Sequence, residues 1–294
     1  MPHKAGFVNI IGKPNVGKST LMNAMIGKNL SIITSKAQTT RHRILGIVNG
    51  EEFQVVYSDT PGLITPGYKL QEYMLKFARS AFTDADIILY VTDIEDDTEK
   101  ASEMVAQLNK LKTPLLILIN KIDLSNEEDV NRLIKIWQEA VPAATIIPIS
   151  ALEKFNLERI FALLLESLPE SPPFYPKDEL TDKSERFFVS EMIREKILVN
   201  YQQEVPYAVQ VEVESFKESE KIINIASIIY VERESQKGIL IGQQGKALKK
   251  VGTMARIDME KFFGKKVFLE LFVKVKKDWR NDGRILKQFG YNPT

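Results

Sequence analysis

The 294-residue sequence contains no cysteine and only two histidines, His3 and His42. It can therefore form neither disulfides nor thiolate metal sites, and the histidine count excludes a histidine metal cluster or a His-based triad. Long apolar runs are also missing, because no stretch approaches the ~20 residues that span a bilayer. The N-terminus leads directly into an apolar segment without a signal peptide. We therefore expect a soluble, cytoplasmic protein.

The net charge of +1 conceals an uneven distribution. Residues 1–184 carry 20 Lys and Arg against 24 Asp and Glu, whereas residues 185–294 carry 20 against 15. Within residues 237–287 the count is 14 against 5, so the positive excess is concentrated there. Such a basic cluster favours a polyanionic partner such as nucleic acid. A solvated lysine face explains the same counts equally well, so charge alone does not decide.

The motif G-K-P-N-V-G-K-S-T at residues 12–20 fits the phosphate-binding pattern G-x-x-x-x-G-K-[ST] without a mismatch. The apolar run Phe7–Ile11 before it predicts a buried strand, and apolar side chains within residues 21–26 follow at helical spacing. Because the glycines let the backbone bend, successive N–H groups can converge on phosphate oxygens at a helix N-terminus. Lys18 adds a positive charge, and the Ser19 hydroxyl is suited to ligate Mg²⁺.

Four further apolar runs alternate with amphipathic segments in the first 168 residues. Continuous apolar strands are what a parallel sheet covered on both faces requires. We therefore predict a doubly wound α/β domain whose ligands bind at the carboxyl ends of its strands. The predicted strands cover residues 53–57, 87–91, 115–119 and 145–149, and the predicted helices lie near residues 70–82, 99–111, 127–140 and 156–167.

Three of these strands are followed directly by polar motifs. D-T-P-G at residues 59–62 places a carboxylate where it can hold Mg²⁺ through water and an N–H where it can reach a γ-phosphate. N-K-I-D at residues 120–123 places the Asp123 carboxylate where it can accept hydrogen bonds from the N1 and N2 edge of guanine, which adenine lacks. Ser150-Ala151-Leu152 offers a backbone N–H for guanine O6. In this chain order the motifs predict a guanine nucleotide site.

Residues 35–43, S-K-A-Q-T-T-R-H-R, are polar and lack periodicity. A threonine of this loop that completes the Mg²⁺ shell only when the γ-phosphate is present would make the loop a switch. The residues alone leave both Thr39 and Thr40 as candidates.

A proline-rich segment at residues 169–176 ends the strand and helix alternation and predicts a stiff, extended connection. The rest of the chain predicts a small α+β domain. Its expected elements are a helix near 185–200, strands at 208–213 and 222–231, a Gly-rich turn, a long helix from about Lys246 and a strand near 267–275. The predicted buried stripes are Phe187, Phe188, Ile193 and Ile197 on the first helix, and Leu248, Val251, Ala255, Met259 and Phe262 on the long helix.

The turn G-Q-Q-G at residues 242–245 opens that long helix and is followed by Lys246, Lys249 and Lys250. This arrangement resembles a KH domain with its third strand last, in which such a loop clamps the backbone of single-stranded RNA. Glycines allow a close approach to the sugar-phosphate, and lysines neutralise it. An ordinary helix-capping turn is the alternative, but the coincidence with the basic cluster favours RNA.

The motifs G-K-P-N-V-G-K-S, T-T-R, D-T-P-G, N-K-I-D and S-A-L together resemble those of the translation-factor-related GTPases, and Q-T-T-R-H-R narrows the resemblance to the Era family. The resemblance implies an α/β P-loop GTPase domain with a doubly wound, mostly parallel sheet over residues 1–171, a linker over 172–184 and an α+β KH domain over 185–294. It also implies GTP hydrolysis with Mg²⁺, binding of 16S ribosomal RNA and not DNA, and a role in 30S subunit assembly. It favours Thr40 over Thr39 as the metal ligand.

Leu63 follows the D-T-P-G motif, where Ras-like proteins carry a glutamine that orients water. Leucine cannot orient water. In related enzymes with a hydrophobic residue here, a potassium ion held partly by the phosphate-loop asparagine takes the place of an arginine finger. The resemblance assigns that role to Asn15 and implies slow, potassium-assisted hydrolysis.

The expected functional residues fall into four sets. The catalytic residues are Asn15, Lys18, Thr40 and Gly62, and the metal ligands are Ser19, Thr40 and Asp59. The nucleotide-binding residues are Gly12, Lys13, Pro14, Asn15, Val16, Gly17, Lys18, Ser19, Thr20, Asp59, Thr60, Pro61, Gly62, Leu63, Asn120, Lys121, Ile122, Asp123, Ser150, Ala151 and Leu152. The RNA-binding residues are Ile239, Ile241, Gly242, Gln243, Gln244, Gly245, Lys246, Lys249 and Lys250.

Other functions remain open alternatives. A metabolic P-loop kinase or ATPase would share the phosphate loop, but the N-K-I-D motif argues against adenine. A pure RNA-binding scaffold would keep the nucleotide site for structure alone. The basic domain would also suit another RNA or the anionic inner face of the cell membrane, and we keep peripheral membrane association as a secondary expectation.

Overall fold

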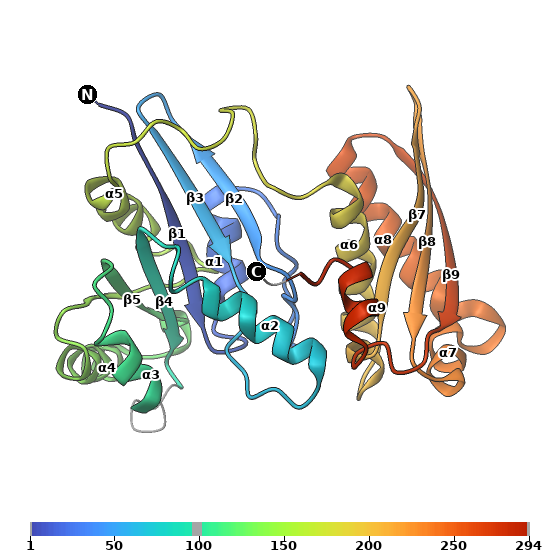
Figure 1. Ribbon diagram of the computed structural model, residues 1–294, viewed down its shortest axis with the longest axis horizontal. Coiled ribbons are helices and arrows are strands. Elements are labelled where there is room, and N and C mark those ends of the chain that lie inside the picture. The colour runs from blue at the N-terminus through green and yellow to red at the C-terminus, as the bar shows by residue number, and fades with distance from the viewer. Residues whose placement is uncertain (1, 96–101, 293–294) are drawn as a thin grey trace.

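Two separate β-sheets organise the chain (Figure 1). The computed structural model describes residues 2–95 and 102–292. The first sheet has six strands in the order β2-β3-β1-β4-β5-β6, and β2 alone is antiparallel to its neighbour. Its strands are β1 (Lys4–Gly12), β2 (Ile44–Asn49), β3 (Phe53–Asp59), β4 (Ile87–Asp93), β5 (Leu115–Asn120) and β6 (Thr145–Pro148).

Helices cover both faces of the first sheet. Because successive side chains of a strand point to opposite faces, Ile10 packs in one core and Ile11 in the other. The first core receives side chains of α1 and α5, and the second receives side chains of α3 and α4. The helices are α1 (Lys18–Ile26), α2 (Lys69–Ser80), α3 (Ser102–Leu108), α4 (Glu127–Ala140) and α5 (Leu157–Ser167), with a short η1 (Ile122–Leu124). The parallel arrangement brings the carboxyl ends of β1, β3, β4 and β5 to one edge.

The second sheet has three strands, β7-β8-β9, with β7 antiparallel and β9 parallel to β8. Helices α6 and α8 cover one face and lie between this sheet and the first half of the molecule (Figure 1). The elements are α6 (Glu185–Asn200), η2 (Val205–Tyr207), β7 (Gln210–Glu218), β8 (Ile222–Val231), α7 (Glu234–Ile241), η3 (Gln243–Gly245), α8 (Lys246–Phe263), β9 (Lys266–Val275) and α9 (Gly283–Gln288).

The proline-rich connection is bonded to the edge of the first sheet. Gln54 accepts hydrogen bonds from the backbone N–H groups of Phe174 and Tyr175, at 2.7 and 3.0 Å. Further on, the Ile47 N–H donates to the carbonyl of Leu180 at 2.8 Å. The connection is therefore a strap that runs beside β2 and β3 before α6 begins.

The predicted fold class is confirmed, and the differences from prediction lie in short elements. Strand β2 and helices α7 and α9 were not predicted, and the strand predicted at residues 208–213 runs instead from Gln210 to Glu218. The predicted residues 99–101 of the third helix lie outside the described part of the chain.

One predicted core position is wrong. Phe262 is 41% exposed, although its ring contacts Phe188 at a centroid distance of 5.3 Å. It lies on the side of α8 that turns away from the sheet, at the margin of a groove between the two halves. Within the described residues, no helix has the length and apolar character needed to cross a bilayer.

Candidate functional site

The loop between β1 and α1 has backbone torsions that favour glycine. Gly17 has φ of 98°, and a Cβ there would lie 2.2 Å from the side-chain nitrogen of Asn120. A Cβ at Gly12 would lie 2.2 Å from the Val91 carbonyl oxygen. Asn15 adopts a left-handed φ of 65°. The loop therefore curves tightly into the start of α1, where free N–H groups favour an anion.

The side chain of Lys18 is buried and folds back over this loop. Its Nζ donates to the carbonyl oxygens of Gly12 at 3.1 Å and Lys13 at 2.6 Å. Burial lowers the pKa of Lys18 to about 8, although the nearby charge of Asp59 acts in the opposite direction. Bound phosphate oxygens would add negative charge and favour the protonated lysine.

Three side-chain oxygens converge beside the loop. The Ser19 hydroxyl donates to Asp59 Oδ2 at 2.7 Å, and Thr40 Oγ1 lies 3.3 Å from the same oxygen. Burial raises the pKa of Asp59, while the Ser19 hydrogen bond and Lys18 oppose that rise. The other carboxylate oxygen, Oδ1, is buried and has no hydrogen-bond partner among the described residues. This set of oxygen donors with one unpartnered carboxylate oxygen fits Mg²⁺.

The geometry separates the two candidate threonines. Thr39 Oγ1 donates to the carbonyl of Lys36 at 2.6 Å and lies 2.6 Å from Thr34 Oγ1. Thr40 is the one that reaches Asp59. The structure therefore favours Thr40 as the candidate metal ligand.

The D-T-P-G motif lies against the phosphate loop. A Cβ at Gly62 would meet the Pro14 backbone nitrogen at 2.7 Å, so the two loops touch through backbone atoms. The Leu63 N–H donates to the carbonyl of Gly12 at 3.2 Å, and its side chain packs against the core that contains Ile11. Leu63 therefore contributes an apolar contact here and no group that can orient water.

Asn120 connects three loops at the opposite end of the site. Its side chain donates to the Val16 carbonyl at 2.8 Å and accepts from the Ala151 N–H at 2.9 Å. The phosphate loop, the N-K-I-D loop and the S-A-L loop are thus fixed relative to one another. Ser150 is buried, and its hydroxyl accepts from the Glu153 N–H at 3.1 Å, which shapes the third loop.

A cavity of about 270 Å³ runs between these loops. The predicted residues that line it are Pro14, Asn15, Gly17, Lys18, Ser19, Thr20, Thr40, Thr60, Gly62, Asn120, Lys121, Asp123, Ala151 and Leu152. The predicted residues outside its lining are Gly12, Lys13, Val16, Asp59, Pro61, Leu63, Ile122 and Ser150. Asp59 still contacts the lining through Ser19 and Thr40, whereas Ile122 packs against the core that contains Trp137.

Some residues that line the cavity were not predicted to bind nucleotide. These are Ile32, Ile33, Thr34, Gln38 and Leu124, together with Thr39, which was considered only as the alternative metal ligand. The first four belong to the irregular segment between α1 and β2, where the sequence offers no periodicity to show which side chains point inward. Leu124 directly follows the N-K-I-D motif, and this position next to the motif could have identified it as a lining residue.

The second candidate site is the turn between α7 and α8. Gly242, Gln244 and Gly245 all have positive φ, of 69°, 51° and 75°. Beside the turn, a groove of about 330 Å³ opens between α8 and β9. Gly245 and Lys249 line it, together with Leu248, Gly252, Thr253, Arg256, Leu269 and Leu271. The predicted residues Ile239, Ile241, Gly242, Gln243, Gln244, Lys246 and Lys250 lie outside that lining.

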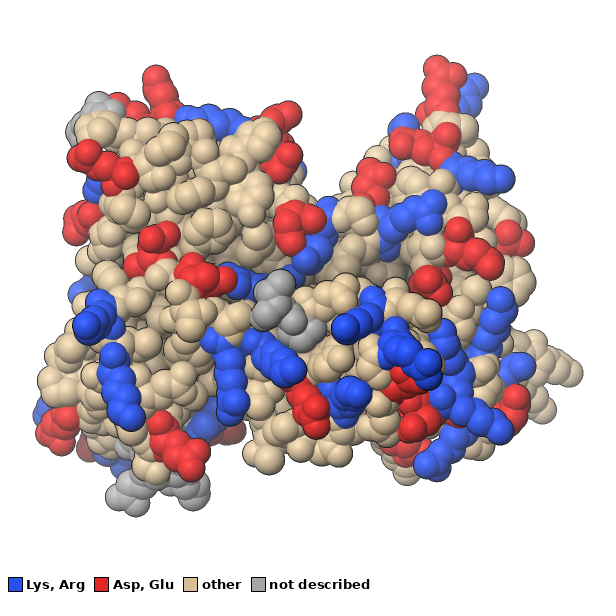
Figure 2. All heavy atoms as spheres, viewed as in Figure 1, with Lys and Arg blue, Asp and Glu red and all other residues tan. Residues whose placement is uncertain are grey.

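Arg256 is the basic residue of this groove that the sequence reasoning missed. It stands seven positions after Lys249, so the helical spacing was a usable signal. Figure 2 shows lysine and arginine side chains gathered on the half that contains the second sheet, chiefly around α9 and the nearby ends of the strands. The groove thus lies in the more basic half of the molecule.

The irregular loop at residues 35–43 also contacts the second half of the chain. Arg41 is 1% exposed, and its guanidinium donates to the carbonyls of Val209 at 2.7 Å, Tyr207 at 3.2 Å and Pro206 at 3.3 Å. Burial of a charged group is costly unless its N–H groups find partners. These three carbonyls accept from both terminal nitrogens of Arg41, while its buried Nε has no partner among the described residues. The position of this loop and the position of the turn before β7 therefore depend on each other.

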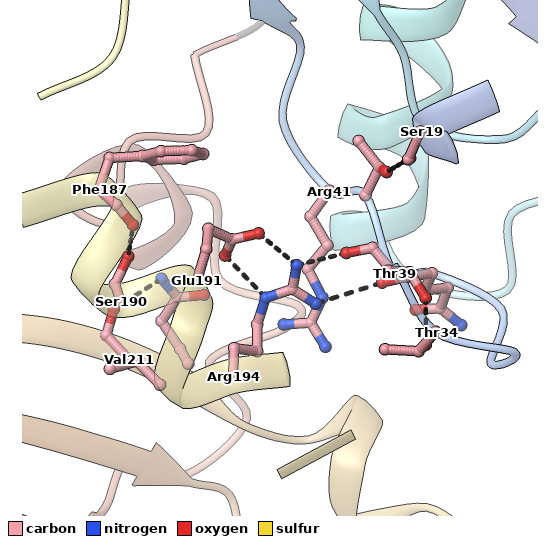
Figure 3. Close-up of polar contacts among 12 residues, drawn as sticks. Ser19, Thr34, Thr39, Arg41, Phe187, Ser190, Glu191, Arg194 and Val211 are labelled. Carbon is pink, nitrogen blue, oxygen red and sulfur yellow. Dashed lines mark hydrogen bonds and ion pairs between the residues drawn. The ribbon is translucent and has the colours of Figure 1, made fainter. Parts of the chain in front are cut away.

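A second arginine, in the second half of the chain, donates hydrogen bonds to the loop at residues 35–43 (Figure 3). Arg194 of α6 donates to the carbonyls of Thr39 and Gln38 and, through Nε, to Glu191 at 2.8 Å. Burial alone would raise the pKa of Glu191, but the adjacent Arg194 holds it below its ordinary value. The pair is therefore ionised and fixed beside the backbone of the loop.

Aromatic and apolar contacts complete this interface. The His42 ring stacks on Tyr291 with a centroid distance of 4.3 Å, and burial lowers the pKa of His42 to about 4, so the ring is neutral near pH 7. Helix α2, which follows the D-T-P-G loop, packs Leu70 and Met74 against Trp279. Both segments that flank the candidate γ-phosphate position thus contact the second half.

Comparison with protein-family models gives two matches. Residues 7–121 match the family described as 50S ribosome-binding GTPase, and residues 204–280 match the KH domain. Together with the phosphate loop and the guanine motif, these matches define a P-loop GTPase joined to a KH domain.

Full-length relatives narrow the class. The chain is 45% identical over 294 residues to GTPase Era of Alkaliphilus metalliredigens, covering 99% of this chain and all of the relative. It is 44% identical over 291 residues to GTPase Era of Staphylococcus haemolyticus, covering 98% and 97%. The chain belongs to the Era family of GTPases.

Solved structures agree with this family assignment. An Era variant from Aquifex aeolicus bound to GDP·AlF₄⁻ superposes with a TM-score of 0.94 at 38% identity, covering 98% of this chain and 99% of that one. An Era complex with MgGDPNP and nucleotides 1506–1542 of 16S ribosomal RNA gives the same score, identity and coverage.

The guanine assignment predicts a change of base preference. Asp123→Asn removes the carboxylate that would accept from the guanine N1 and N2 hydrogens, so the variant should lose GTP and gain xanthosine triphosphate. Loss of a charged hydrogen-bond partner costs about 2–4 kcal/mol, or roughly 30- to 1000-fold in affinity. Nucleotide titration by fluorescence measures this, with Asp129→Asn on α4 as the matched control. Unchanged GTP affinity in Asp123→Asn would remove this residue from the site.

The interface predicts that Arg41→Ala separates the two halves. The change leaves carbonyls of residues 206–209 without their donor, and a buried acceptor left without a partner costs about 1–3 kcal/mol. Small-angle X-ray scattering of the GDPNP-bound protein should show a larger radius of gyration. Arg132→Ala, which removes an exposed arginine paired with Asp129, should leave the radius unchanged. A scattering curve identical to that of the parent would contradict the role of Arg41.

Proposed function

We propose that this protein is a GTP-hydrolysing switch that binds the 3′ region of 16S ribosomal RNA through its KH domain and acts in assembly of the 30S subunit. The observation that carries the proposal is the contact between the loop at residues 35–43, which lines the nucleotide cavity, and the KH half. The similarity to the Era complex with MgGDPNP and 16S ribosomal RNA supports the choice of both ligands. In this proposal residues 1–171 bind nucleotide, 172–184 connect and 185–294 bind RNA.

The nucleotide half would act chiefly by positioning. The N–H groups at the start of α1 hold the phosphates, and Lys18 places a positive charge beside them. The Gly62 N–H lies in the loop that touches the phosphate loop and is suited to contact the γ-phosphate. Asp123 selects guanine, and the side chain of Lys121 lies along the base.

Magnesium fits the oxygen donors around Asp59. Ser19 and Thr40 would ligate it, and Asp59 would hold it through water. When bound, the ion neutralises charge on the β- and γ-phosphates. The unpartnered Oδ1 of buried Asp59 supports this assignment, because a buried acceptor without a partner is unfavourable in the free protein.

The family resemblance is the basis for potassium assistance in this proposal, and the positions of Leu63 and Asn15 are compatible with it. The Leu63 side chain packs against the core and offers no polar group that could orient water. The Asn15 amide nitrogen donates to the Ser35 carbonyl at 3.1 Å, which turns Nδ2 towards the switch loop. Asn15 would contribute a side-chain oxygen to a monovalent cation beside the phosphates.

The groove beside Gly245 favours RNA over a lipid surface for the basic half. It is a narrow concave site with a loop of positive φ at one end and Lys249 and Arg256 along it, which suits one phosphodiester strand. A lipid surface would need an exposed apolar or basic helix face, not a groove between a helix and a strand.

The potassium assignment predicts a salt effect on turnover. Hydrolysis of GTP should be about tenfold faster in potassium chloride than in sodium chloride, equivalent to about 1.4 kcal/mol in the barrier. Asn15→Ala should bring the two rates together while leaving GDP affinity nearly unchanged. The measurement is phosphate release at equal ionic strength. Equal rates of the parent protein in both salts would rule out the potassium role.

The KH assignment predicts that RNA binding is separable from nucleotide binding. Gly245→Asp places a carboxylate where an RNA phosphate would lie, so affinity for an RNA spanning nucleotides 1506–1542 of 16S ribosomal RNA should fall at least tenfold, about 1.4 kcal/mol. A Cβ at Gly245 meets nothing within 4 Å, so the protein itself has room for it. Gly245→Asn is the matched control, because asparagine has the same shape, tolerates the left-handed conformation and carries no charge.

The same titrations at two salt concentrations test Lys249. Lys249→Ala should lower the slope of the logarithm of affinity against salt by about one, because one phosphate contact is lost. GTP affinity should stay at the parent value in all three variants. Parent-like RNA binding by Gly245→Asp, or loss of GTP binding with it, would contradict an independent RNA site. If RNA binds without stimulating GTP turnover, the protein is an RNA-binding scaffold and not a GTP-hydrolysing switch.

A further inference from the structure

One carboxylate near the guanine end of the cavity belongs to none of the nucleotide motifs. Asp93 is the last residue of β4, and the parallel register places it directly beside Asn120, the last residue of β5. The Oδ2 of Asp93 lies 2.6 Å from the Nζ of Lys121, the residue that follows Asn120. The Oδ1 of Asp93 accepts from the Glu95 N–H at 3.1 Å. Both oxygens of Asp93 are therefore engaged, and the carboxylate is fixed before any ligand binds.

The Lys121 side chain is held in position by a residue from another strand, Asp93. The Lys121 backbone is left-handed, with φ of 65°, an unfavourable conformation for a residue with a side chain. A lysine side chain has several rotatable bonds and loses much conformational entropy when it is held in one arrangement. Among the described residues, the side-chain nitrogen of Lys121 bonds to Asp93, and the side chain lines the nucleotide cavity. The pair is partly protected from solvent, with 10% of the Asp93 side chain exposed and 33% of that of Lys121.

We propose that Asp93 is a positioning residue for guanine: it holds Lys121 extended across the base side of the cavity, so that the methylene chain packs on the ring of GTP or GDP. This inference rests on the proposed guanine site and adds a residue to it. Asp93 does not touch nucleotide in this arrangement. It acts through Lys121, and it reduces the ordering that nucleotide binding would otherwise require of that side chain.

A purely structural ion pair is the alternative. In that case Asp93 would stabilise the end of β4 whatever side chain stands at position 121, and its removal would lower the melting temperature and nucleotide affinity together. The positioning role predicts instead that the effect of Asp93 on affinity vanishes when Lys121 is absent. A double-mutant cycle separates the two.

The experiment measures GDP and GTP dissociation constants for Asp93→Asn, Lys121→Ala and the double variant, with melting temperature as the check on folding. Asp93→Asn should weaken both nucleotides by about tenfold, and by the same factor for each, because the phosphates are not involved. In the Lys121→Ala background the same change should have less than a twofold effect. Asp93→Glu should restore part of the affinity. Glu218→Gln, which removes the partner of Lys265 in the KH half, is the charge-matched control and should match the parent.

The outcomes also separate this inference from the guanine site itself. If Asp93→Asn weakens binding equally with and without Lys121, or does not weaken it at all, Asp93 is not a positioning residue. If Lys121→Ala and Asp123→Asn both bind GDP like the parent protein, the guanine assignment fails first.

Discussion

The two halves are joined by several buried contacts, among which the guanidinium of Arg41 is nearly inaccessible to solvent. Three carbonyls of residues 206–209 accept from this charge and offset part of the cost of burying it. Its neighbour Thr40 faces Asp59 in the nucleotide half. Adjacent residues of one loop thus bond to the candidate metal site and to the KH half. A displacement of Thr40 cannot leave Arg41 unaffected, because one peptide unit joins them.

The nucleotide site contains buried charges whose partners are incomplete within the protein. Burial lowers the pKa of Lys18 and raises that of Asp59, so each is less favourable in its charged form than it would be in water. A triphosphate with a divalent cation complements both at once. A ligand that brings these opposite charges should stabilise the folded state as well as occupy the cavity.

Contiguous motifs were predictable from the sequence, whereas contacts between distant segments were not. The phosphate loop, the strand that ends at Asn120 and the turn at Gly245 each combine a local pattern with a local physical role, and each lies where the pattern indicated. The bonds of Arg41 and Arg194 join residues more than 150 positions apart, and no local periodicity reports them. Asp93 was missed for a similar reason, because only the pairing of β4 with β5 brings it to Lys121.

The strap between the two halves leaves very little free chain. Asp182 still accepts from the Leu45 N–H at 3.0 Å, and Ser184 already caps α6 by accepting from the Phe187 N–H. One residue, Lys183, separates these two anchored points. With the strap in place, any reorientation of the KH half must therefore come from torsion changes at or next to Lys183. The groove beside Gly245 would then move relative to the GTPase half by rotation about this point.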